Sequence, residues 1–129
     1  MRNRSAVIII ENEKVLLIQR NKDNSIYYVF PGGGIENGET PKEAAKREAL
    51  EELGVEVNVK DYLMEVNWNG TQYFYVAEII SGTIGTGTAE EFNDPTRGTY
   101  TPMWIDIKSL TVINILPKEV VKVIQNYSF

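Results

Sequence analysis

The chain has 129 residues, of which 43% are hydrophobic and 24% are charged. These proportions are typical of a globular protein that can bury one core, so we expect a single domain over residues 1–129. It contains no cysteine and no histidine, which excludes disulfides, thiolate or imidazole metal sites and Ser-His-Asp catalysis. The net charge of −5 disfavours a nucleic-acid polymer as partner, because a phosphate backbone requires a basic surface.

No apolar run approaches the roughly 20 residues that a transmembrane helix needs. The chain starts with MRNRSAVIII, in which the apolar stretch is short and no small-residue cleavage site follows, so we do not expect a signal peptide. With the absence of cysteine, these features predict a cytoplasmic protein that has no membrane partner.

The first third of the chain reads as strands. Ala6–Ile10 and Val15–Gln19 are rich in β-branched and aliphatic residues, and the polar residues between them predict a hairpin turn. Tyr27–Phe30 predicts a short aromatic strand that ends at Pro31. The glycines at 32–34 then permit a turn geometry that residues with a Cβ avoid.

A helix is predicted from Thr40 to about Leu53. Thr40 is a favourable N-cap, Pro41 suits the first helical position, and Glu43 completes a capping box. Gly54 is a typical residue for ending a helix.

The remaining chain predicts more strands and one final helix. Asn69-Gly70 is a hairpin turn signal, whereas residues 81–101 lack periodicity and predict a long functional or mobile loop. Pro117 opens the last helix, with an apolar stripe at Val120, Val121 and Ile124. The strands expected here are Val55–Val59, Tyr62–Trp68, Thr71–Ile80 and Met103–Asp106. This layout predicts a mixed β-sheet with a helix on each side, an α/β/α sandwich of the α+β class.

Three glutamates share one side of the first predicted helix. Glu48, Glu51 and Glu52 are spaced i, i+3 and i+4, so their side chains are near neighbours whose like charges destabilise an isolated helix. A divalent cation would compensate for this repulsion, because Mg²⁺ favours a few carboxylates together with substrate phosphates. The alternative is an acidic helix face that is simply solvated.

The segment from Gly33 to Val55 fits the pattern G-x5-E-x7-R-E-U-x-E-E-x-G-U, where U is aliphatic. This pattern resembles the box of the Nudix hydrolases, MutT-like enzymes that cleave nucleoside diphosphates linked to another moiety. Ala49 is smaller than the aliphatic residue that is usual at its position. The residues that match the fixed positions are Gly33, Glu39, Arg47, Glu48, Glu51, Glu52, Gly54 and Val55.

The resemblance implies a Nudix fold and a Mg²⁺ or Mn²⁺ site. It assigns the metal to Glu48, Glu51, Glu52 and the backbone carbonyl of Gly32. It also implies that Arg47 orients the glutamates, although pairing with helix neighbours would explain an arginine there equally well. We interpret Glu39 as structural support for the loop or helix start.

The catalytic base differs between members of such a family and lies either in the box or in a later loop. Here Glu51 and Glu52 are the candidates in the box, and Glu90 and Glu91 are the candidates in the long loop. The alternative for Glu90 and Glu91 is ordinary exposure to solvent.

Candidate substrate contacts are Arg20, Tyr28 and Tyr73. Arg20 could equally be a surface cation, and tyrosines in strands are more often part of the core. Tyr73 lies 18 residues beyond Val55, a position resembling one found in diadenosine polyphosphate hydrolases. In the pattern that marks ADP-ribose hydrolases, a proline follows the box at a fixed distance. This chain has Gly70 and Thr71 at the corresponding positions.

The resemblance implies a Mg²⁺-dependent pyrophosphohydrolase that acts on a small nucleotide, either a nucleoside triphosphate or another nucleoside diphosphate derivative. The alternative is a nucleotide-sensing module that retains the fold without turnover. An exposed edge strand could also pair across a homodimer.

Overall fold

The structure is a computed structural model that describes residues 2–67, 69–87 and 98–127. Its elements in chain order are β1 (Arg4–Glu11), β2 (Lys14–Lys22), β3 (Ser25–Val29), β4 (Gly32–Gly34), α1 (Pro41–Leu53), β5 (Val55–Asn67), β6 (Thr71–Gly82), β7 (Thr99–Asp106), the 3-10 turn η3 (Ile107–Ser109), β8 (Ile115–Leu116) and α2 (Glu119–Asn126).

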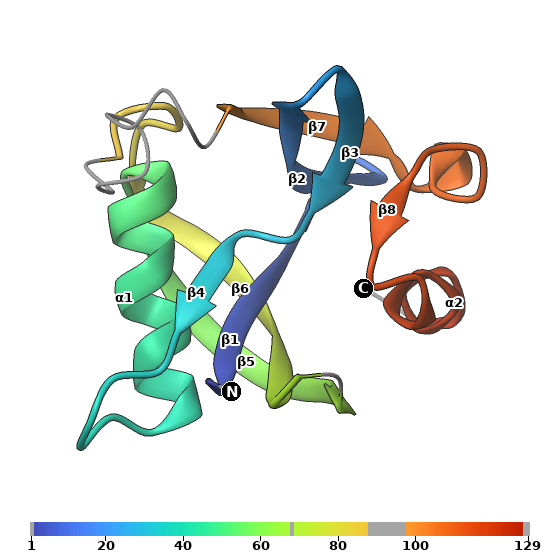
Figure 1. Cartoon of the computed structure of the whole chain (residues 1–129). Coiled ribbons are helices and arrows are strands. Elements are labelled where there is room, and N and C mark those ends of the chain that lie inside the picture. Colours follow the sequence, from blue (N-terminus) through green and yellow to red (C-terminus); the bar gives the residue numbers. More distant parts are fainter. Residues whose placement is uncertain (1, 68, 88–97, 128–129) are drawn as a thin grey trace.

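The strands form one mixed sheet in the order β5-β6-β1-β2-β3-β8, with β4 also paired to β1 and β7 also paired to β2 (Figure 1). The pairs β1–β6 and β3–β8 are parallel, and the other pairs are antiparallel. The predicted mixed sheet is therefore confirmed.

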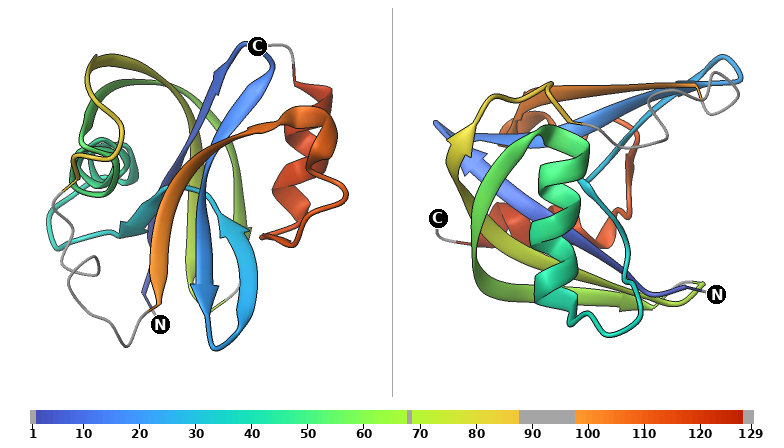
Figure 2. Two further views of the ribbon diagram at one scale, coloured as in Figure 1. Left: turned by 90° about the horizontal axis from the view of Figure 1, so that it is seen from above. Right: turned by 90° about the vertical axis from the view of Figure 1, so that its left-hand side faces the viewer.

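Helices α1 and α2 lie on opposite sides of the strands (Figures 1 and 2). Side chains of a strand point alternately to the two faces of its sheet, and β1 shows this directly. Val7 and Ile9 belong to the buried cluster that includes Ala45 and Leu53 of α1. Ala6 and Ile8 belong to the cluster beneath α2. Because both faces are covered, β1 is an almost continuous apolar run.

Helix α1 begins and ends where the sequence predicts. The Thr40 side chain accepts a hydrogen bond from the Glu43 backbone, the Glu43 side chain accepts one from the Thr40 backbone, and Gly54 has a left-handed φ of 81°. The hydroxyl of Ser5, which is fully buried, donates a 2.6 Å hydrogen bond to the carbonyl of Pro41. This bond fixes the first turn of α1 to β1.

The prediction of two separate strands at Val55–Val59 and Tyr62–Trp68 was wrong, because the chain is one continuous strand there. The structure has one strand, β5, with register shifts against β6 between Val59 and Tyr62. Such bulges bend a strand without ending it. Trp68 lies outside the described residues.

Gly32, Gly33 and Gly34 form strand β4 and not a turn, so the expected role of these glycines needs correction. None of the three has a positive φ. A Cβ on Gly32 would lie 2.2 Å from the carbonyl oxygen of Ser5. The glycines are needed because β4 approaches its neighbours closely, and not because of a left-handed backbone.

Strand β7 begins at Thr99, four residues before the predicted strand, because it pairs with β2 along its whole length. Residues 88–97 of the predicted long loop lie outside the described part. The predicted final helix is confirmed, with Val120, Val121 and Ile124 buried. Among the described residues, no helix has the length and apolar character to cross a bilayer.

Candidate active site

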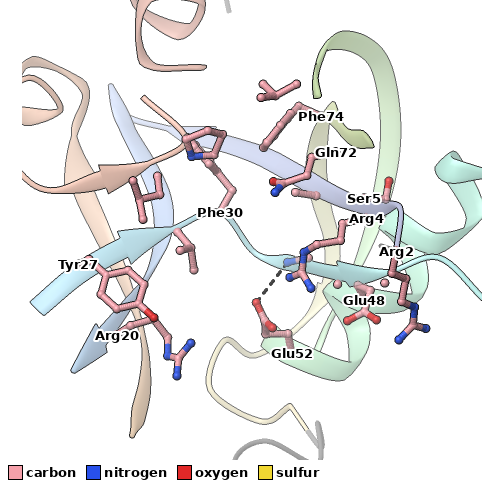
Figure 3. A pocket seen from close by; sticks show the side chains of 18 of the residues that line it. Arg2, Arg4, Ser5, Arg20, Tyr27, Phe30, Glu48, Glu52, Gln72 and Phe74 are labelled. Carbon is pink, nitrogen blue, oxygen red and sulfur yellow. Dashed lines mark hydrogen bonds between the residues drawn. The ribbon is translucent and has the colours of Figure 1, made fainter. Parts of the chain in front are cut away.

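A cleft of about 990 Å³ opens where α1, β4 and the start of β1 meet. Figure 3 shows its side chains converging from both sides of β4. An acidic group comes from α1, cationic groups come from β1 and β2, and aromatic rings come from β3, β6 and β7. The charged residues that line it are Arg2, Arg4, Arg20, Glu48, Glu51, Glu52, Lys118 and Glu119.

The three predicted helix glutamates all line this cleft. Glu48 and Glu52 are buried, with exposed fractions of 9% and 5%, whereas the side chain of Glu51 is 44% exposed. Buried carboxylates are costly unless they are hydrogen-bonded, paired with a cation or bound to a metal. The helix therefore does not carry an ordinary solvated acidic face.

The outer edge of β4 faces α1. The Ile35 N–H donates to the Asn3 carbonyl, and the Val7 N–H donates to the Pro31 carbonyl, so these positions bond the β4 segment to the β1 segment. In an antiparallel pair the bonded positions alternate with unbonded ones, and the backbone groups of Gly32 and Gly34 are therefore directed outward. The Gly32 N–H donates to Oε1 of Glu52 at 3.2 Å, and the Gly34 carbonyl accepts from Nη2 of Arg47 at 2.9 Å. Because the N–H and C=O of one strand residue point to the same edge, the Gly32 carbonyl shares the edge occupied by Glu52.

Gly33 makes room for Glu48. A Cβ added to Gly33 would lie 2.4 Å from Cδ of Glu48 and 2.5 Å from both of its carboxylate oxygens. The carboxylate therefore rests against the backbone of β4, and any larger residue at position 33 would displace it.

Arg47 connects the loop before α1, strand β4 and the helix glutamates. Its guanidinium donates to both oxygens of Glu39, at 2.6 Å and 2.9 Å. The same group donates to Glu48 at 2.8 Å and to Glu51 at 3.1 Å. With the contact to the Gly34 carbonyl, the planar donors of arginine are used on four different residues.

Glu39 is held as a carboxylate by this arrangement. Hydrogen bonds from Arg47 lower the pKa of Glu39 from 4.5 to about 2, with a further contribution from the Glu36 backbone. The same bonds raise the pKa of Arg47, so the pair stays ionised at any ordinary pH. Glu39 also accepts from the Glu36 backbone at 3.0 Å, which fixes the loop that leads into α1.

The donor set fits a divalent cation with oxygen ligands. Among the described residues, no three acidic side chains are close enough to enclose an ion by themselves. Mg²⁺ does not need such a cage, because it is usually held by one or two carboxylates together with water and substrate phosphates. Buried Glu48 and Glu52, on one cleft with the outward carbonyl of Gly32, satisfy that requirement.

Arg20 lies with aromatic rings at another part of the cleft. Its Cζ is 3.7 Å from the centre of the Tyr100 ring and 5.7 Å from that of Tyr27. Its Nε donates to the carbonyl of Thr99 at 3.2 Å. Arg20, Tyr27 and Tyr100 all line the cleft, and the contact of the guanidinium with the two rings is of the cation–π kind.

The family model of the NUDIX domain matches residues 1–122, nearly the whole chain. The chain belongs to the Nudix family. It is 32% identical over 113 residues to "Putative nudix hydrolase 1" of Caenorhabditis elegans, a match over 82% of this chain and 29% of that protein. It is 40% identical over 60 residues to CTP pyrophosphohydrolase of Escherichia coli, which covers 45% of this chain and 44% of that protein.

The fold is also that of solved Nudix proteins. A MutT structure from work on Aliivibrio salmonicida and Vibrio cholerae superposes with a TM-score of 0.73 at 21% identity, and the match covers 98% of each chain. In both curated relatives the matched region is less than half of the relative's own length. These similarities establish the family and the fold, and the substrate is a separate question.

Two of the predicted substrate contacts do not line the cleft of this Nudix domain. Tyr28 packs against the core beneath α2, and its hydroxyl accepts from Nε2 of Gln19 at 3.0 Å. Tyr73 lies between Gln72 and Phe74, which do line the cleft, so its side chain is directed to the other face of the sheet. The two loop candidates for the base, Glu90 and Glu91, lie outside the described residues.

Other residues that line the cleft were not selected from the sequence. They include Arg2, Arg4, Gln72, Tyr100, Lys118 and Glu119. The alternation of Arg2 and Arg4 with Asn3 was a usable signal, because it places both arginines on one face of an approaching strand. Nothing local marks Tyr100 or Lys118, which reach the cleft only through the pairing of β7 with β2 and β8 with β3.

Proposed function

We propose that this Nudix domain is a Mg²⁺-dependent pyrophosphohydrolase that cleaves a phosphoanhydride in a nucleoside triphosphate or another nucleoside diphosphate derivative. The observation that carries the proposal is the burial of Glu48 and Glu52 beside Gly32 in a cleft that also contains cationic and aromatic side chains. The pyrophosphohydrolase name of the Escherichia coli relative supports the same reaction class. Mn²⁺ is the alternative ion.

In this proposal the Gly32 carbonyl and one or two of Glu48, Glu51 and Glu52 hold the cation together with water and substrate phosphates. When bound, the cation supplies electrophilic stabilisation of the phosphate oxygens. Arg47 keeps the glutamates in position through its bonds to Glu48 and Glu51.

A carboxylate must accept the proton of the attacking water. Glu51 is the most exposed of Glu48, Glu51 and Glu52, and it forms an ion pair with Arg47. We therefore propose Glu51 or Glu52 as the base within the described part of the chain. Glu90 and Glu91 remain candidates from the loop that follows β6. Arg20 is the proposed substrate contact that lies in the cleft, whereas Tyr28 and Tyr73 would need a substrate that extends beyond it.

The proposal extends to the domain organisation, the location and the partners of the protein. We take residues 1–129 as one Nudix domain, cytoplasmic because the sequence has no cysteine, with a small nucleotide as its partner and no nucleic-acid polymer. Strand β5 is at the end of the sheet order. Its outer edge is the surface through which a homodimer would pair.

The test is hydrolysis of a broad nucleotide panel with Mg²⁺, with and without a chelator. We expect the wild-type protein to release phosphate or pyrophosphate only when the metal is present. Glu52→Gln should lower kcat/KM by about 100-fold or more, because it removes a charged ligand or the base. Glu78→Gln, which changes an exposed glutamate on β6, is the matched control and should leave the rate unchanged.

If the wild-type protein hydrolyses nothing in the panel with Mg²⁺ or Mn²⁺, the enzymatic proposal is wrong. Saturable nucleotide binding under those conditions would then support the sensing alternative.

A further inference from the structure

The chain that follows β6 packs against the C-terminal end of α1 (Figure 1). The Gly85 N–H donates a hydrogen bond to the Leu53 carbonyl at 3.0 Å. The Thr86 hydroxyl lies within hydrogen-bond distance of two carbonyl oxygens, that of Thr83 at 2.7 Å and that of Gly54 at 3.3 Å. Because a helix leaves the carbonyls of its last turn without partners inside the helix, these contacts attach the segment 83–87 to α1.

Gly87 lies directly against the main chain of two helix glutamates. A Cβ added to Gly87 would lie 2.5 Å from the carbonyl oxygens of both Glu51 and Glu52. Its φ is outside the left-handed region, so the backbone conformation does not require glycine there. The requirement comes from the close approach of two main chains, since the opposing carbonyls cannot rotate away as the end of a side chain can.

Glu52 is therefore in contact with a glycine at each end. Its Oε1 accepts the Gly32 N–H of β4 at 3.2 Å, and its carbonyl oxygen faces Gly87. The residue is 5% exposed, so its side chain has little space in which to compensate for a movement of its main chain. Glu52 lines both the cleft and a smaller cavity of about 460 Å³ whose wall includes Gly87.

A side chain at position 87 would force the segment 83–87 and the helix apart. The segment is held in place, because Ile84 packs against the buried cluster beneath α1 and Gly85 is bonded to Leu53. The last turn of α1 would then move and carry the carboxylates of Glu51 and Glu52 with it. A small movement is enough, since the groups of a functional site must be held within about 0.5 Å of their working positions.

We propose that Gly87 is a positioning residue for the metal site. By allowing the segment 83–87 to pass against the carbonyls of Glu51 and Glu52, it sets the position of the Glu52 carboxylate beside β4. The inference rests on the proposed function, since it takes Glu52 and the Gly32 carbonyl as ligands of the cation. It adds a residue that lies outside the segment from Gly33 to Val55 and follows β6 in the chain.

The test measures binding of Mn²⁺ to the protein by electron paramagnetic resonance of the free ion, first without nucleotide and then with α,β-methylene-ATP. Gly87→Ala should raise the Kd for Mn²⁺ by about 10-fold, as expected for residues that hold metal ligands in place. Glu52→Gln should also weaken binding and identifies the ion at this site.

Gly85→Ala is the matched control, because it makes the same substitution in the same segment. Gly85 has a φ of 98°, and a Cβ there would meet no atom of the described residues within 4 Å. The variant should lower the thermal midpoint through backbone strain and change the Kd for Mn²⁺ by less than about 2-fold. A loss of stability alone would therefore not explain a higher Kd in Gly87→Ala.

A double variant separates position from packing. Thr86→Ala removes the hydroxyl that holds the segment 83–87, so in Thr86→Ala/Gly87→Ala the segment should move in place of the helix. The Kd for Mn²⁺ should return to within about 3-fold of the wild-type value, although the thermal midpoint should be lower than that of either single variant. General damage to the fold would instead make the two losses of affinity add.

Wild-type affinity in Gly87→Ala, equal weakening in Gly85→Ala, or a double variant no better than Gly87→Ala would each overturn the inference. Weaker binding by Glu52→Gln would show in those cases that the proposed metal site still stands. Failure of the wild-type protein to bind Mn²⁺ under both conditions would refute the metal site and the inference together.

If Gly87→Ala does not fold, a titration of ¹⁵N-labelled wild-type protein with Mg²⁺ decides the question. The amide resonance of Gly87 should shift with the same midpoint as that of Glu52, because their main chains are in contact. The amide of Lys122, on the exposed face of α2, should not shift. An unchanged Gly87 resonance would refute its role.

Discussion

At the scale of single residues, Arg47 and Glu39 explain how mutually repelling glutamates are held together. Arg47 donates to Glu39, Glu48 and Glu51 at once. An arginine is suited to this task because its fixed fork makes several charge-assisted hydrogen bonds with little loss of side-chain entropy. The sequence showed the i and i+4 relation of Arg47 to Glu51, whereas the contact with Glu39 joins residues in different elements.

The pKa of Glu39 gives a pH-dependent prediction. Because the folded-state pKa is about 2 and the ordinary value is 4.5, the stabilisation by Glu39 is fully present above the ordinary value. It is lost as the pH falls from about 4.5 to about 2. We expect Glu39→Gln to lower the free energy of unfolding by about 1 kcal/mol near neutral pH. The difference from wild type should shrink through that acidic window.

Urea unfolding at a series of pH values measures this difference. Glu78→Gln, at an exposed position of β6, should follow the wild-type curve throughout. A Glu39→Gln deficit that stays constant down to the lowest pH would contradict the assignment of the stabilisation to the ionised carboxylate.

At the scale of elements, the site is the contact of one helix with one short strand. Helix α1 is fixed at its start by the capping box and the Ser5–Pro41 hydrogen bond. At its end, Gly85 donates a backbone hydrogen bond to the Leu53 carbonyl, which satisfies one of the acceptors that a helix leaves open. Strand β4 then approaches the helix closely enough for Glu48 to rest on Gly33.

Gly33→Ala tests that close approach. The added Cβ would overlap the Glu48 carboxylate, and the flexible end of the glutamate should move away while the fold is kept. We expect metal-dependent activity to fall by about 10- to 100-fold, since small displacements of catalytic groups have effects of that size. The thermal midpoint should change little. Unchanged activity in a folded Gly33→Ala protein would show that the position of Glu48 is not critical.

At the scale of the whole molecule, the cleft depends on a sheet that is covered on both faces. The core beneath α2 includes Phe30 and Phe74, whose rings meet edge to face at 5.6 Å. Both rings also line the cleft. Packing of α2 therefore supports the floor of the site, although the acidic groups come from the opposite helix.

Ile124→Ala tests the contribution of α2 to the fold. Ile124 is 1% exposed within this core, so its truncation should cost about 2–5 kcal/mol of unfolding free energy through lost burial and a residual cavity. Lys122→Ala, on the exposed face of the same helix, should cost less than about 0.5 kcal/mol. The comparison uses urea unfolding at neutral pH. A loss for Ile124→Ala as small as that for Lys122→Ala would mean that α2 is not firmly packed.

The sequence by itself determined the parts of this protein that depend on local spacing. The limits of α1 follow from the properties of Thr40, Pro41 and Gly54, and the acidic group follows from the helical repeat of Glu48, Glu51 and Glu52. Strands β1, β2, β3, β6 and part of β7 and the stripe of α2 were likewise visible as local patterns, because each is set by residues close together in the chain. Strands β4 and β8 were not predicted, and β5 was divided in two.

Only the tertiary structure decided which distant residues share the cleft. Arg2, Gln72, Tyr100 and Lys118 come from separate segments, and their meeting depends on strand pairings whose register no local pattern shows. The tertiary structure also decided that Tyr27 lines the cleft whereas its neighbour Tyr28 packs against the core. The alternation along β3 was visible in the sequence, but the face on which the cleft would open was set by how α1 and β4 pack against β1.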